Sequence, residues 1–148
     1  MYLCGDDDGM SDAVERLSIY LHLAHASQLR GRLHVRDRLL ILAGVIAAEN
    51  KLTRIAACCR HRVLQHNPQH LLGRWPTLSE ALADADFAHF LRHLYRRYPD
   101  ERAERMLVTL GIERGCERAT YFSDEEYASS LLRVPFTALE QFGPGENP

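Results

Sequence analysis

The sequence has no long hydrophobic run. Its longest apolar stretch is Leu39–Ala48, and a helix of that length spans about 15 Å, half of the hydrocarbon core of a bilayer. The first residues show neither a basic start nor an apolar stretch, so they do not resemble a signal peptide. We therefore expect no membrane span, a cytoplasmic location, and a buried helix over Leu39–Ala48.

The sequence contains no CxxC motif. The four cysteines are Cys4, Cys58, Cys59 and Cys116. Cys58 and Cys59 are adjacent on one expected helix, which disfavours a bond between them. This usage is typical of free thiols in a reducing compartment.

Several enzyme signatures are also absent, namely GxGxxG, GxxxxGK[ST], GxSxG, HExxH and ExxH. The eight histidines include three pairs at helical spacing, His22 with His25, His66 with His70, and His89 with His93. In the first pair His25 lies near an apolar stripe and is expected to be a core histidine; the second pair straddles Asn67-Pro68, and the third is expected to face water. We predict no cofactor and no metal site, and we do not expect an enzyme.

The charge balance excludes a uniformly basic nucleic-acid binder. The chain is 46% hydrophobic and 26% charged, with a net charge of −2, as in ordinary globular proteins. Within this balance, residues 50–79 contain no acidic side chain, while acidic residues gather at the N-terminus and in the C-terminal third. The basic stretch is expected to be an ordinary solvated face, to meet the acidic parts within the fold or between protomers, or to form an anion-binding face.

Strand patterns are lacking as well, because β-branched residues do not alternate with polar ones and no Asn-Gly or Asp-Gly turn occurs. Helical periodicity predicts an all-α fold of antiparallel hairpins, either a repeat-like array or a compact bundle. We expect an acidic flexible tail over 1–10, one domain over 11–134 and an irregular tail over 135–148. The expected helix starts are Ser11, Thr53, Thr77 with Glu80, Asp86, Pro99, and Ser123 with Glu126.

The segment 37–70 shows a more specific pattern. Gly44 lies in the middle of one expected helix, Ala56 lies near the start of the next, and Pro68 follows its end, each about twelve residues after the last. In this spacing the segment resembles a single tetratricopeptide repeat, although Arg60 replaces the aromatic residue of that motif. The resemblance implies a scaffold that binds another protein or peptide.

The basic window offers candidate contact residues. Arg54, Arg62 and Arg74 would contact a partner protein or an anion, with nucleic acid as an alternative ligand. A further alternative is a thiol site, since helical spacing places Cys58 beside His61 on the outer face of its helix and Cys59 on the inner face. We predict a non-enzymatic protein-interaction module, and the sequence does not determine its oligomeric state.

Overall fold

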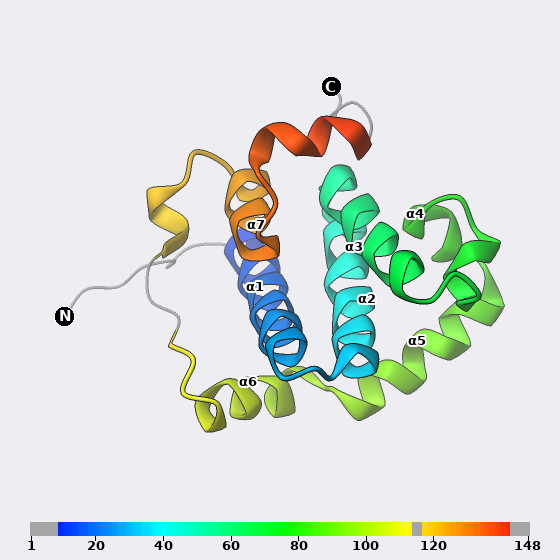
Figure 1. Cartoon of the computed structure of the whole chain (residues 1–148), viewed down its shortest axis with the longest axis horizontal. Helices are drawn as coiled ribbons and strands as arrows, with labels where there is room; N and C mark the ends of the chain where they lie inside the picture. The colour runs from blue at the N-terminus through cyan, green and yellow to red at the C-terminus, as the bar shows by residue number, and fades with distance from the viewer. Residues whose placement is uncertain (1–8, 114–116, 143–148) are drawn as a thin grey trace.

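The computed structural model describes residues 9–113 and 117–142, with side chains from residue 12 onward. Within these residues the fold is all-α and contains no strand, which confirms the predicted fold class (Figure 1). None of the described helices is both long enough and apolar enough to cross a membrane. The elements are α1 (Gly9–Leu29), α2 (Leu33–Glu49), α3 (Thr53–His66), η1 (Leu71–Arg74), α4 (Leu78–Ala81), α5 (Ala85–Arg97), α6 (Asp100–Thr109), η2 (Glu117–Thr120), α7 (Asp124–Leu132) and η3 (Phe136–Phe142), where η denotes a 3₁₀-helix.

The long helix α2 forms the centre of the molecule. It packs against α1 on one side and against α3 on another, and it also contacts α4 and α5 (Figure 1). Every residue from Leu39 to Ala47 is buried, because neighbouring elements cover the helix all round. The predicted buried helix is thus confirmed.

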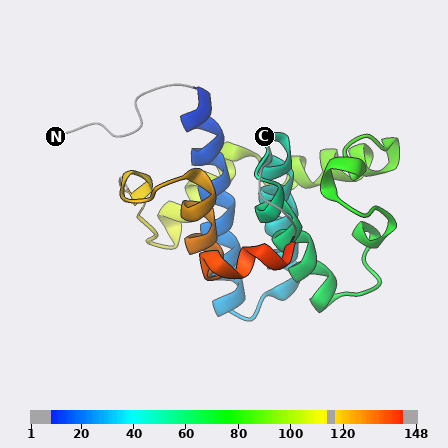
Figure 2. The ribbon, with the colours of Figure 1, turned by 90° about the horizontal axis from the view of Figure 1, so that it is seen from above.

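The C-terminal elements close the bundle. Helix α7 packs on α1 and contacts α3, and η3 extends from α7 across to α3 (Figure 2). The last helices therefore return to the first ones, whereas in an open repeat array each unit contacts only its neighbours. The expected irregular tail from residue 135 is wrong for Phe136–Phe142, which form η3 and bury Leu139 in the core.

The hairpin of α2 and α3 is closely packed at Gly44. A Cβ atom on Gly44 would lie 3.1 Å from Cβ of Cys59 and 2.6 Å from Cδ1 of Leu78. Glycine is unfavourable inside a helix by about 1 kcal/mol, so this close approach accounts for its presence. The resemblance of 37–70 to a tetratricopeptide repeat stays a prediction.

Capping side chains set several helix ends as predicted. The hydroxyl groups of Thr77 and Ser123 accept backbone hydrogen bonds, both at 3.1 Å, at the starts of α4 and α7. The chain leaves α1 and α6 through Gly31 and Gly111, which have φ values of +73° and +74°. Such left-handed positions favour glycine because it has no Cβ.

Three other predicted caps are wrong. Helix α1 begins at Gly9, before Ser11. Helix α3 already includes Thr53, because the chain turns at Lys51 with a φ of 64° and the cap position falls on Leu52. Helix α5 is capped by Asp84 and not by Asp86, since the Asp84 carboxylate accepts the hydrogen bond of the Asp86 backbone amide at 2.8 Å.

Candidate anion-binding site

A network of polar contacts holds α6 against α1. The hydroxyl of Tyr20 donates to the Asp100 carboxylate at 2.8 Å and to the backbone carbonyl of Tyr98 at 2.7 Å. Arg16 donates from Nε to the other oxygen of the same carboxylate at 2.9 Å. Burial and the contact with Asp100 raise the pKa of Tyr20, so it stays a neutral donor. These contacts position α6 beside the turn that joins α1 to α2.

A pocket of about 390 Å³ lies between this turn and α6, and we call it the arginine pocket. Both elements lie along the same edge of the molecule in Figure 1. Hydrogen bonds fix the turn, because the backbone amide of Arg32 donates to the carbonyl of Ser27 at 2.8 Å. The lining residues are Ser27, Arg30, Arg32, Val35, Arg102, Arg105, Met106, Thr109 and Leu110.

The lining separates into an apolar floor and a basic rim. Val35, Met106 and Leu110 are partly buried against the core and form the floor. The four arginines are exposed and form the rim. Among the described residues that line the pocket there is no carboxylate. An exposed cluster of guanidinium groups above an apolar surface favours a ligand that combines negative charge with a carbon skeleton.

Most of the N–H donors of the rim arginines have no described partner within the fold. Arg102 donates to the backbone carbonyl of Arg97 at 2.7 Å, and its guanidinium lies 5.5 Å from the centre of the Tyr98 ring. In the part of the chain that the structure describes, the side chains of the other three make no hydrogen bond or ion pair. The C-terminal ends of α1 and α6 contribute about half a negative charge each. The four full positive charges of the rim outweigh these partial charges, so the lining residues carry a net positive charge.

The predicted contact residues lie elsewhere, and two of them are paired within the fold. Arg54 forms a two-pronged ion pair with Glu125 of α7, at 2.8 and 2.6 Å, with both side chains about 15% exposed. Arg74 pairs with Asp86 at 3.1 Å and lies 4.9 Å from the centre of the Trp75 ring. At these positions the basic window does meet acidic parts of the chain.

The third predicted residue, Arg62, is half-buried beside a small cavity between α1, α2 and α7. Its charge acts on its neighbours, since it helps to lower the pKa of His25, which burial lowers most. Arg54 thus lies beside the start of α7, Arg62 lies near its end, and Arg74 lies beside Asp86 of α5.

The expected exposure of Cys58 is wrong. Both Cys58 and Cys59 are buried, Cys58 being 1% exposed, because η3 and α7 cover the face of α3 that was expected to be outside. Burial raises the pKa of the Cys58 thiol, and the charge of Arg62 offsets this only in part. His61 is exposed and packs edge-on against Phe142, with no described hydrogen bond to Cys58. This environment disfavours a thiolate.

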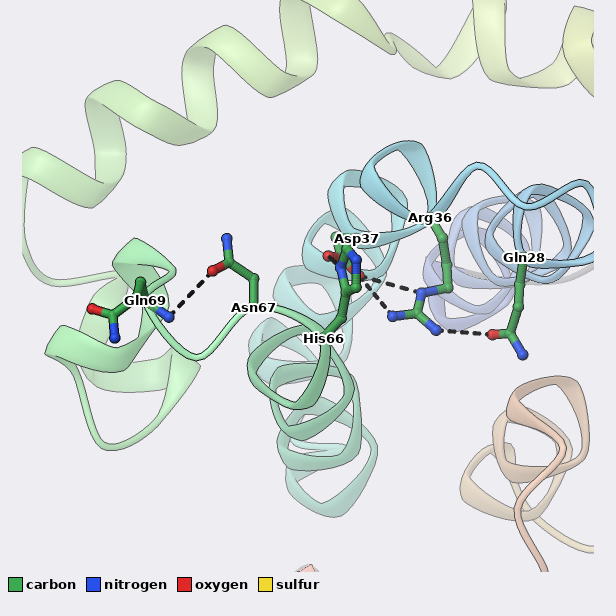
Figure 3. A network of polar contacts seen from close by, with 6 residues as sticks. All are labelled: Gln28, Arg36, Asp37, His66, Asn67 and Gln69. Atoms are coloured by element: carbon green, nitrogen blue, oxygen red, sulfur yellow. Dashed lines mark hydrogen bonds and ion pairs between the residues drawn. The ribbon is translucent and has the colours of Figure 1, made fainter.

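A second polar cluster surrounds Asp37 near the start of α2 (Figure 3). Its buried carboxylate accepts hydrogen bonds from Arg36 at 2.9 and 3.2 Å and contacts Nδ1 of His66, the last residue of α3, at 2.5 Å. Arg36 also donates to Gln28 of α1 at 3.1 Å. A buried carboxylate requires such partners, and this cluster joins the ends of three helices.

The histidines do not form a metal centre in the described part of the chain, where no group of three or more His, Cys, Asp or Glu side chains could hold an ion. His89 and His93 are exposed, as predicted, and their Nε2 atoms lie 3.2 Å apart. Cys4 and Cys116 lie outside the described residues.

Sequence reasoning missed the arginine pocket. The stretch between Glu15 and Asp37 contains no acidic residue and includes Arg30 and Arg32, which is a local indication of positive charge. The other half of the rim lies on α6, whose Asp100, Glu101 and Glu104 conceal it in any count of charge. Only folding brings the two halves together.

The fold defines an all-helical protein with a localised basic pocket. Comparison of the chain with protein families, with curated proteins and with solved structures finds no match.

Proposed function

We propose that this protein is a non-enzymatic binding module that holds an acidic segment of a partner protein in the arginine pocket. One observation supports this proposal above the others, namely four exposed arginines around an apolar floor with no carboxylate among the lining residues. Arginine binds carboxylates through two parallel hydrogen bonds, and arginine clusters are a recurring means of recognising acidic peptide motifs.

A protein partner fits these charges better than a nucleic acid does. Nucleic-acid binding gains most of its affinity from many phosphate contacts along an extended basic track. Here the net charge is −2, and Arg54 and Arg74 of the basic window already pair with carboxylates. Four arginines without a described carboxylate partner line one pocket, and this local group suits a short anionic segment.

A peptide titration tests the proposal. The probe is a fluorescein-labelled peptide rich in Glu with a central Tyr, and its counterpart has Gln in place of every Glu. We expect the acidic peptide alone to bind, with an affinity that falls as salt screens the charges. Replacement of Arg30 and Arg105 by Glu (Arg30→Glu with Arg105→Glu) should weaken binding by about tenfold or more, equivalent to about 1.4 kcal/mol.

A matched control reverses the same amount of charge away from the pocket. Arg92 and Arg96 are exposed on α5 and do not line the arginine pocket. Arg92→Glu with Arg96→Glu should leave the affinity within about twofold of the wild type. An equal loss of affinity in the two double variants would mean that binding depends only on the net charge of the protein. Binding of a mixed-sequence single-stranded DNA but not of the peptide would replace the proposal with the nucleic-acid alternative.

A further inference from the structure

The arginine pocket offers more hydrogen-bond donors than one carboxylate can use. Each guanidinium carries five N–H donors in a fixed planar fork, and three of the four rim arginines make no described side-chain hydrogen bond or ion pair. Ser27 and Thr109 add hydroxyl groups to the lining. A carboxylate carries one negative charge on two oxygens, whereas a phosphate monoester carries between about −1.5 and −2 on three acceptor oxygens. The donor set therefore matches a phosphate better in both charge and number.

The chemistry of arginine is compatible with a phosphate ligand. Every basic residue that lines the pocket is arginine, as is nearly every basic residue of the chain. Arginine and lysine differ here, because the arginine fork binds phosphate through paired parallel hydrogen bonds and lysine acts as a point charge.

The size and the floor of the pocket suit a side chain rather than a bare ion. A volume of about 390 Å³ falls within the range of small-ligand sites. Val35, Met106 and Leu110 provide apolar contact below the rim. The carbon body of a phosphorylated side chain would lie on this floor while its phosphate meets the arginines.

We infer that the anion received by the arginine pocket is a phosphate monoester on a side chain of the partner, so that phosphorylation of the partner promotes binding. This inference rests on the proposed function and specifies its ligand. The phosphate oxygens accept hydrogen bonds from the rim, and no covalent bond forms or breaks.

The test compares acidic peptides that differ only at the central residue, which is Ser, phosphoserine, Tyr, phosphotyrosine or Glu. We expect the affinity of each phosphorylated peptide to exceed that of its unmodified form by about tenfold or more. It should also exceed the affinity of the Glu peptide. The phosphotyrosine peptide should bind more tightly than the phosphoserine peptide, because only the aromatic ring can cover the apolar floor. Met106→Gln should reduce that difference between the two phosphopeptides.

A conservative variant separates recognition of phosphate from general attraction. Arg30→Lys with Arg105→Lys retains both charges and removes two planar forks. For this variant, phosphorylation of the peptide should raise the affinity much less than it does for the wild type. The variant should still bind the unmodified acidic peptide. Far-UV circular dichroism and thermal unfolding would verify that it folds.

The outcomes distinguish the two proposals. Arginine-dependent binding of all the peptides with no gain from phosphorylation would overturn the phosphate inference and leave the proposed function in place. Absence of binding by every peptide, in a folded protein, would overturn both. A gain from phosphorylation that the lysine variant retains in full would also contradict the inference, since charge alone would then explain it.

Discussion

His70 shows how a single side chain connects the fold to pH. Its Nδ1 atom accepts the backbone hydrogen bond of Leu72 at 3.0 Å and so caps η1. Burial lowers the pKa of His70, and the negative charge of Asp37 opposes this shift only in part. The folded protein therefore favours the neutral ring, which can accept this hydrogen bond, while a protonated ring cannot.

The sign of the pH effect follows from this shift. A histidine whose pKa is lower in the folded state than in the unfolded state contributes stability above its unfolded pKa of about 6.5. That stability is lost as the pH falls through the folded pKa. We expect His70→Asn, which keeps a capping acceptor and removes the titration, to reduce the loss of unfolding free energy between about pH 7.5 and pH 5.

Urea titrations of the wild type and the variant at several pH values would measure this loss. His25 has a lowered pKa as well, so the pH dependence of the variant should shrink without vanishing. An unchanged dependence would show that His70 does not titrate as inferred.

At the scale of elements, the packing of α2 against α3 and α4 depends on the missing side chain of Gly44. A methyl group there would meet Cβ of Cys59 and the end of the Leu78 side chain, both of them buried. Overpacking of this kind lowers the free energy of unfolding by about 1–3 kcal/mol. The higher helix propensity of alanine relative to glycine raises it by about 1 kcal/mol. The packing cost is therefore expected to exceed the gain.

We expect Gly44→Ala to lower the free energy of unfolding by up to about 2 kcal/mol, measured by chemical denaturation. In a Leu78→Ala background the same change should cost less, because the closest contact is removed. Gly73→Ala is the control, since its new Cβ would lie 3.8 Å from the nearest atom and meet only ordinary contact. A cost at Gly44 that does not depend on Leu78 would contradict this account of the packing.

At the scale of the whole molecule, closure of the bundle depends on η3. This short helix contacts both α3 and α7 (Figure 2), and its Leu139 side chain is fully buried. It lies over the face of α3 that contains Cys58. Removal of a buried leucine side chain typically costs about 2–5 kcal/mol.

Leu139→Ala should therefore destabilise the protein by about 2–5 kcal/mol and increase the reactivity of Cys58 toward a thiol reagent. Glu140→Ala, at the exposed neighbouring position, should change the stability by no more than about 0.5 kcal/mol. Unaltered stability and thiol reactivity in Leu139→Ala would mean that η3 does not contribute to the fold.

The sequence by itself determined the features that depend on neighbours within one or two helical turns. The all-α class, the buried α2, the caps at Thr77 and Ser123 and the glycine ends of α1 and α6 follow from side-chain spacing and backbone preferences. Even at this range, competing residues such as Asp84 and Asp86 made one cap ambiguous.

Only the tertiary structure decided which distant segments meet. It covered both faces of α3 and so buried Cys58, and it paired Arg54 with Glu125. It also brought the α1–α2 turn to α6 and so assembled the arginine pocket. These outcomes depend on how apolar surfaces fit together across the chain, and the local periodicity of a sequence records that a helix has an apolar face but not which partner covers it.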